Sequence, residues 1–317
     1  MLRDLREVEP EFVEQYKAEF FEKFTRKIVF SDNEVTVMDS FFEGASRPTR
    51  SFVFNDRLHL TQSEVALCEM PDSTSENEPE FDRSTLALDV HRALCMPLAW
   101  FVERDKKSKP LRAAVLGAGA CALPLFLLKH YPPQVLGRLD AVEPSSQVND
   151  VAEHFFGVGT ALQNDTRLVI HEKMGEDFLA EQEASTVLDF LVLDVEAGEN
   201  CAGVRAPPLS MLESEFLEMA KSRLDARGIM AVNVITESKE ALMDVEIKLG
   251  RVFSHGLRLT LPANTTFFLF NDEHSPLGVS EYIRLITTNA VQAQHAQTPS
   301  LLAKSQLTFW SAKASYQ

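Results

Sequence analysis

The sequence is poor in the features that define several classes of protein. Its four cysteines are widely spaced and form no C-x-x-C pair, which excludes a disulfide framework and a zinc site of the usual spacing. Its 31 basic residues are outnumbered by 47 acidic ones, so the formal net charge is −16. A chain this acidic lacks the basic face that a nucleic-acid backbone requires. We therefore expect reduced thiols, a cytoplasmic location and no nucleic-acid partner.

The sequence also lacks a membrane-spanning or signal segment. The uncharged stretch 113–128 is too short to cross a bilayer and is interrupted by two glycines and a proline. The first twelve residues are charged and contain no apolar signal core. A hydrophobic content of 45% over 317 residues is ample for one large domain or two modest ones. These features predict a soluble protein without a membrane partner, and they leave the oligomeric state open.

What the sequence does contain is one nucleotide-binding pattern, in residues 112–144. An apolar run of strand length, 113–116, leads into a glycine turn and then into a helix-compatible segment, 123–130. A second apolar run, 139–142, ends on Glu143. Strand, glycine turn, helix, strand and acid in this order are typical of the first half of a dinucleotide-binding βαβ unit.

Each polar feature of this unit has a predicted role. Gly117 permits the tight turn, and Gly119 lets a ligand approach the backbone because no Cβ intervenes. The N–H groups at the start of the following helix suit an anionic or polar ligand group. Glu143 can accept hydrogen bonds from both ribose hydroxyls of a nucleoside. The pattern predicts an adenosine-type cofactor, although a tight turn in any α/β protein is the plainer interpretation.

The remainder of the chain continues the alternation of strands and helices. Strands are expected at 167–170, 188–193 and 229–235, with helices between them, and this alternation favours a parallel sheet. Only residues 262–265 separate the last two apolar runs, 257–261 and 266–270, which requires an antiparallel hairpin. The predicted fold class is α/β: a Rossmann-like class I methyltransferase sheet with an antiparallel last strand, preceded by a small β-rich lobe.

Composition divides the chain into four segments. Residues 1–68 are predicted to form an N-terminal helix and a β-rich lobe, the helix carrying an aromatic stripe at 12, 16, 20 and 24. Residues 69–82 hold six acids and no base, which is typical of a disordered linker. Residues 83–290 form the cofactor-binding domain, beginning with a helix over 83–102. Residues 291–317 are polar and weakly patterned, and we expect a poorly ordered tail.

Chemistry is expected where the parallel strands end. Asp194 follows the strand 188–193, where a carboxylate can orient an amine and stabilise a developing positive charge; a loop-ordering acid is the alternative. His91, on the first helix, is a second catalytic candidate or else a surface histidine, and Asn233 is interpreted as a core amide. The predicted cofactor-binding residues are Gly117, Ala118, Gly119, Glu143, Pro144, Met174, Gly175 and Asp194.

Six segments carry a family resemblance: 50–67, 89–98, 114–132, 139–157, 188–197 and 207–235. Gln62-Ser63-Glu64 and the double proline 207–208 before an acidic helix are more specific than the glycine turn. Together these segments resemble the C-terminal module of the dual elongation factor 1-alpha lysine and N-terminal methyltransferases, in the spermidine-synthase-like branch of class I methyltransferases. The resemblance implies methyl transfer from S-adenosyl-L-methionine to the N-terminal α-amine of elongation factor 1-alpha. The lysine-directed activity belongs to that family's other module.

The sequence departs from the family in three places, and two other functions stay open. Met174 replaces an aspartate, Ala120-Cys121 follow Gly119 where a third glycine is usual, and Glu196 replaces an aspartate.

A polyamine synthase shares the fold, but Arg92 would repel a diamine and the Asp-x-x-Asp pattern after strand four is absent. A degenerate, non-catalytic binding module is the other alternative. A nicotinamide-dependent dehydrogenase is disfavoured because no second catalytic constellation is present.

Overall fold

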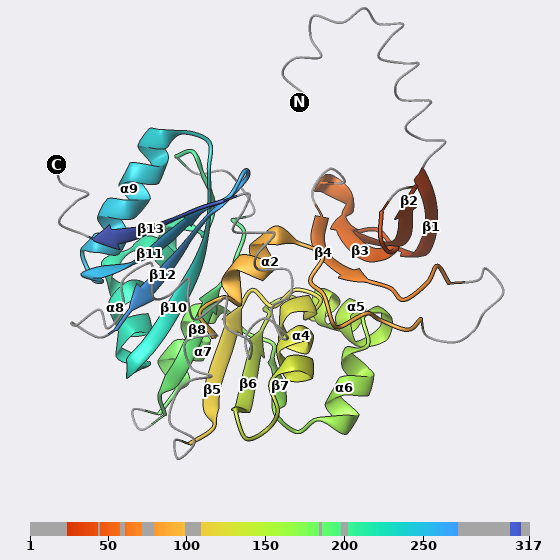
Figure 1. The fold of residues 1–317 in the computed structure, drawn as a ribbon, viewed down its shortest axis with the longest axis horizontal. Helices are drawn as coiled ribbons and strands as arrows, with labels where there is room; N and C mark the ends of the chain where they lie inside the picture. The colour runs from red at the N-terminus through yellow and green to blue at the C-terminus, as the bar shows by residue number, and fades with distance from the viewer. Residues whose placement is uncertain are drawn as a thin grey trace, which may run out of the picture. The chain divides into compact units, whose positions relative to one another are not determined.

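The computed structural model describes residues 24–43, 45–57, 61–71, 79–98, 109–183, 186–197, 202–271 and 305–311. The chain forms two compact units, Met1–Asp82 and Arg83–Gln317, and both are drawn in Figure 1. Most of the predicted aromatic helix lies outside the described residues. Its last member, Phe24, begins a strand instead, because the chain there pairs with a β-type run.

The first unit contains a four-stranded antiparallel sheet in the order β1-β2-β3-β4. The strands are β1 (Phe24–Ser31), β2 (Val35–Phe42), β3 (Thr49–Phe54) and β4 (Thr61–Ala66), and a 3-10 turn, η2 (Asn55–Arg57), follows β3. Two buried charges join the middle strands: the Arg50 guanidinium donates to both carboxylate oxygens of Asp39, at 2.7 and 2.9 Å. This sheet confirms the predicted β-rich lobe.

The predicted acidic linker is ordered at its C-terminal end. The backbone N–H of Cys68 donates to the Glu80 carbonyl at 2.9 Å, and that of Asp82 donates to the Ala66 carbonyl at 2.8 Å. The side chain of Asp82 also pairs with Arg47 at 2.9 Å. The prediction of disorder is therefore wrong for 79–82, because those residues satisfy their backbone groups beside β4. Residues 72–78 lie outside the described part.

The second unit is built on a nine-stranded, mostly parallel sheet in the order β13-β11-β12-β10-β8-β5-β6-β7, with β9 paired to β10 (Figure 1). Pairing is parallel from β10 to β7, whereas β12 is antiparallel to both β10 and β11. The order reverses between β5 and β8, which makes their carboxyl ends the topological switch point. The strands are β5 (Leu111–Leu116), β6 (Leu136–Val142), β7 (Leu168–His171), β8 (Leu188–Leu193), β9 (Val204–Ala206), β10 (Leu224–Thr236), β11 (His255–Thr260), β12 (Thr265–Phe270) and β13 (Gln306–Ser311).

Helices and a 3-10 turn precede or connect these strands. They are α2 (Asp89–Leu94), α4 (Ala122–His130), α5 (Ser146–Phe155), α6 (Val158–Asn164), α7 (Gly175–Glu181), η3 (Leu209–Leu212), α8 (Ser214–Ser222) and α9 (Lys239–Gly250). Ser145 and Ser238 cap α5 and α9 with their hydroxyl oxygens, at 3.2 and 3.1 Å. The parallel sheet with an antiparallel strand near its end confirms the predicted fold class.

Four details differ from the sequence prediction. The helix expected at 83–102 begins only at Asp89 and ends at Leu94, before Pro97, which has no N–H to donate. Where one helix was expected before the strand 229–235, the structure has two helical elements, η3 and α8, which meet at Glu213. A short strand that was not expected, β9, forms between β8 and η3. The expected poorly ordered tail contributes β13, which pairs with β11 over Gln306–Ser311 because β11 would otherwise present a free edge.

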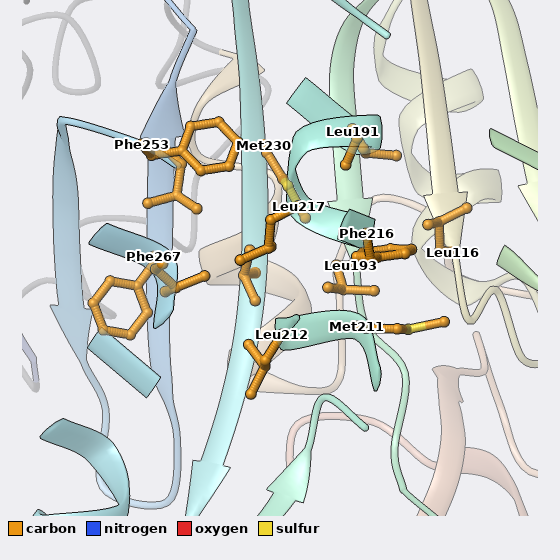
Figure 2. Packing of buried hydrophobic residues seen from close by; sticks show 14 of the residues in the cluster. Leu116, Leu191, Leu193, Met211, Leu212, Phe216, Leu217, Met230, Phe253 and Phe267 are labelled. Atoms are coloured by element: carbon orange, nitrogen blue, oxygen red, sulfur yellow. The ribbon is translucent and has the colours of Figure 1, made fainter. Parts of the chain in front are cut away.

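The core of this unit lies between the sheet and α7, α8 and α9. Figure 2 shows Leu193 and Met230 from the sheet packed with Phe216 and Leu217 from α8. Side chains alternate along a strand, so Val232 and Val234 of β10 point into this core and the residue between them points to the opposite face. That face is covered by α2, which packs on β10 and β12.

Candidate active site

The glycine turn after β5 is held by both neighbouring strands. Gly117 has φ +80° and donates its N–H to the Val142 carbonyl at the end of β6, at 2.9 Å. On the other side, Asp194 donates its backbone N–H to the Leu116 carbonyl at 2.9 Å. A Cβ on Gly117 would lie 2.2 Å from the Asp194 carbonyl oxygen. Only glycine fits there, and the turn is locked against the backbone of the proposed catalytic residue.

The start of α4 is more constrained than the sequence indicated. Gly119 has φ +50° and Cys121, immediately before α4, has φ +58°, which is unusual for a residue with a side chain. Burial raises the pKa of the Cys121 thiol to about 12, so the thiol stays protonated near neutral pH. Cys121 therefore packs beside the turn and is not a nucleophile.

Glu143 lies at the end of β6, where the sequence predicted a ribose ligand. Its carboxylate accepts a hydrogen bond from the Gly119 N–H at 3.2 Å and from the Ser145 N–H at 3.1 Å. Burial raises the pKa of the Glu143 carboxyl, and these two N–H groups partly oppose that effect. The exposed Pro144 separates Glu143 from the cap of α5. The structure thus brings Gly119 and Glu143 together.

Met174 and Gly175 lie after β7, where α7 begins. Met174 directly precedes α7 and its side chain is half exposed. Gly175 is buried, and a Cβ there would lie 3.1 Å from Leu116 Cδ1 and 3.3 Å from Met211 Cε. The absence of a side chain lets α7 begin close to the end of β5. Met174 offers a polarizable thioether at this edge of the sheet in place of a carboxylate.

Asp194 and His91, the two catalytic candidates, lie beside each other. His91 Nε2 on α2 is 3.2 Å from Asp194 Oδ2, although the residues are far apart in sequence. The other carboxylate oxygen, Oδ1, accepts a hydrogen bond from the side-chain amide of Asn233 at 2.8 Å. Asn264, between β11 and β12, donates in turn to Asn233 Oδ1 at 2.9 Å. The side chain of Asp194 is 14% exposed, so it is anchored on two sides and still accessible.

The sequence prediction missed Asn233 as part of this site. Asn233 is the residue between Val232 and Val234 on the face of β10 that α2 covers, and it is 5% exposed. The signal was present, since a polar residue in an apolar strand must find a hydrogen-bond partner. The partner was not readable from sequence, because β8 and β10 become neighbours only in the sheet.

The Glu196 carboxylate, which replaces the family's second aspartate, has an ion-pair partner. Arg205 at β9 donates to Glu196 at 2.9 Å, and the backbone N–H of Ala197 donates to the Arg205 carbonyl at 2.8 Å. The loop after Asp194 is therefore tied to β9 by a charge pair and a backbone bond. The positive charge of Arg205 offsets the negative charge of Glu196 in this loop.

Neither a metal cluster nor a membrane-spanning helix is found in the described residues. No group of three or more histidine, cysteine or carboxylate side chains there is arranged to hold a metal ion. No helix among those residues is both long enough and apolar enough to cross a membrane.

Comparison with known proteins agrees with this geometry. Human methyltransferase-like protein 13, solved in complex with SAH, superposes with a TM-score of 0.56 and 25% identity, covering 66% of this chain and 93% of that one. A probable spermidine synthase from Corynebacterium glutamicum superposes with a TM-score of 0.59 and 16% identity, covering 90% and 91%. The fold is that of a class I methyltransferase. Spermidine synthases share it.

Curated proteins of similar sequence confirm the resemblance drawn from the motifs. The human protein named eEF1A lysine and N-terminal methyltransferase is 31% identical over 159 residues, which are 49% of this chain and 22% of that protein. Its zebrafish (Danio rerio) counterpart is 25% identical over 260 residues, 74% of this chain and 37% of that protein. The matches thus span well under half of these relatives. No family model matches the chain.

Proposed function

We infer that the chain is an S-adenosylmethionine-dependent methyltransferase that methylates a protein amine. The observation that carries this inference is the Asp194 carboxylate. It lies at the topological switch point, against the Gly117 turn, and is anchored by Asn233 and flanked by His91. The relatives are named methyltransferases, and a solved structure at 25% identity is a methyltransferase in complex with SAH.

The cofactor is S-adenosyl-L-methionine, and the glycine turn with Glu143 suits its nucleoside. Glu143 would accept from the ribose hydroxyls, and the backbone at Gly117, Ala118 and Gly119 would face the methionine part. Met174 and Gly175 would border the adenine, where a thioether contacts the ring. When bound, the cofactor supplies an electrophilic methyl group on a sulfonium.

The proposed substrate is the N-terminal α-amine of elongation factor 1-alpha. This proposal draws on the printed names of the relatives and on the chemistry of the site. An α-amine has a pKa of about 7.7–8.0, so a large neutral fraction is present near neutral pH without a strong base. Asp194 would then need only to orient the amine and to offset the positive charge that builds on nitrogen. A net charge of −16 suits a basic protein partner.

The structure counts against a polyamine synthase at this site. Such an enzyme must bind a dication, yet Glu196, two residues after Asp194, is already bonded to the Arg205 guanidinium of β9. On α2, Arg92 follows His91 and is held by Asp89 at 2.6 Å and by the Leu86 carbonyl at 2.7 Å. Asp89 and Glu196 are thus each occupied by a guanidinium, so neither carboxylate is available to bind an ammonium group of a diamine.

Replacing Glu143 is expected to weaken cofactor binding without unfolding the chain. Glu143→Ala removes a charged acceptor, which should cost about 1.5–3 kcal/mol of S-adenosylmethionine binding. The exposed Glu153 on α5 provides a matched control, and Glu153→Ala should bind normally. Calorimetric titration of both variants measures the difference. Equal affinities would show that the ribose is held by other residues.

The raised pKa of Glu143 predicts a pH dependence of the same binding. Protonation of the carboxyl removes the charged acceptor, so wild-type affinity should fall as pH drops through a window that begins above the ordinary value of 4.5. Glu143→Gln should bind more weakly and show no such fall.

Because the folded-state pKa of the Glu143 carboxyl is raised, its ionisation lowers the stability of the cofactor-free fold as pH rises through that window. Glu143→Gln should lack this loss in urea unfolding.

Incubation with labelled cofactor tests the function directly. Purified chain, labelled S-adenosylmethionine and elongation factor 1-alpha are combined, and mass spectrometry locates the label. Label on the N-terminal residue is expected, and acetylation of that amine should abolish it. Label on lysine side chains would contradict the α-amine proposal. A parallel reaction with decarboxylated cofactor and putrescine detects polyamine synthesis, and no transfer in any reaction would favour a binding module.

A further inference from the structure

Asn233 lies among apolar residues but takes no part in the main core. Its neighbours Val232 and Val234 point into the core, and Asn233 points to the opposite face, toward the end of β8. The residue is almost fully buried. A buried primary amide costs free energy unless its donors and acceptor are satisfied, so its partners define its function.

The hydrogen bonds of Asn233 fix which way its amide points. The side-chain nitrogen donates to Asp194 Oδ1 at 2.8 Å, and the side-chain oxygen accepts from Asn264 Nδ2 at 2.9 Å. An ionised carboxylate only accepts hydrogen bonds, so the amide must present its nitrogen to Asp194. Asn264 supplies the matching donor on the other side, at the amide oxygen of Asn233. The two asparagines therefore form a directed chain that ends on the carboxylate.

His91 completes this chain from the opposite oxygen of Asp194. Its Nε2 lies 3.2 Å from Oδ2, and its Nδ1 is buried without a hydrogen-bond partner among the described residues. Nε2 is therefore the ring nitrogen placed to donate to Asp194, since a proton on the buried Nδ1 would have no acceptor among those residues. Each carboxylate oxygen thus has one protein partner and keeps a lone pair for another donor.

We propose that Asn233 is a positioning residue for methyl transfer, supported by the hydrogen bond that it accepts from Asn264. Asn233 holds the Asp194 carboxylate in the orientation that turns Oδ2 toward His91 and leaves acceptor capacity for the substrate amine. The proposal rests on the proposed function in one respect, that Asp194 acts on that amine. Asn233 itself touches neither substrate nor cofactor and acts through Asp194.

A double-mutant cycle tests the proposal. Asn233→Ala removes one hydrogen bond to a charged group, and we expect kcat to fall about tenfold. Affinity for S-adenosylmethionine, measured by calorimetry, should stay within about twofold, because a merely structural loss would weaken both. Asn264→Ala should lower kcat in the same direction by less. Adding Asn233→Ala to Asp194→Asn should produce no further loss, since Asn233 acts only through that carboxylate.

Thr266 provides the matched control. It pairs with Asn233 across β10 and β12, is fully buried, and its hydroxyl has no partner among the described residues. Thr266→Val should therefore keep kcat and the stability of the fold. A wild-type kcat in Asn233→Ala, or losses that multiply in the double mutant, would overturn the proposal alone. A wild-type chain that neither binds the cofactor nor transfers methyl would overturn the proposed function and this proposal together.

Discussion

Asp194→Asn is expected to keep the fold and to lose methyl transfer by roughly 10²–10³-fold, the scale of losing one electrostatic stabiliser. The amide has the same shape and its oxygen can still accept from Asn233. It carries no charge, however, so it cannot offset the positive charge that develops on the attacking nitrogen. Its NH₂ group would also face His91 Nε2, where the wild type presents an acceptor. Single-turnover methylation with saturating cofactor measures the loss.

A second carboxylate in the same loop provides the control for this variant. Glu196 is neutralised by Arg205, so Glu196→Gln should lower activity by less than about tenfold. Wild-type activity should rise with pH through the amine pKa of about 7.7–8.0. Near-normal turnover in Asp194→Asn together with a flat pH profile would contradict both the role of Asp194 and the α-amine substrate.

Gly117→Ala is expected to destabilise the fold by at least about 3 kcal/mol, because two costs add. Gly117 has φ +80°, a conformation that disfavours any side chain. Its new Cβ would also lie 2.2 Å from the backbone oxygen of Asp194, where no flexible group can move aside. The ends of β5 and β8 would have to separate, and the carboxylate would shift with them. Urea unfolding gives the stability, and calorimetry gives cofactor affinity in the fraction that remains folded.

A substitution at Gly203 measures the cost of the backbone conformation without the cost of the close contact. Gly203 has φ +76°, but a Cβ there would meet only Ala241 Cβ at an ordinary 3.4 Å. Gly203→Ala should therefore cost about 1–2 kcal/mol from the backbone conformation alone. Equal destabilisation by the two variants would show that the close approach of Gly117 to Asp194 contributes nothing.

The sequence by itself determined the local units of this protein. The strand, glycine turn and helix around Gly117, with Glu143 on the next strand, depend on residues within one βαβ unit, and their periods of 2 and 3.6 are readable directly. The antiparallel pairing of β11 and β12 followed as well, because four intervening residues permit no crossover. The position of Asp194 at the edge of the sheet was predictable, because parallel strands place their carboxyl ends at one edge.

Only the tertiary structure decided which distant residues share the site. His91 lies beside Asp194 because α2 packs on the face of β10 opposite the main core. Asn233 lies beside them because β10 pairs with β8. No local pattern encodes which strand becomes the neighbour of which. The pairing of Glu196 with Arg205 depends on β9 returning to β10 in the same way. These contacts depend on the register and packing of strands across the sheet, and burial of the whole core determines that register and packing.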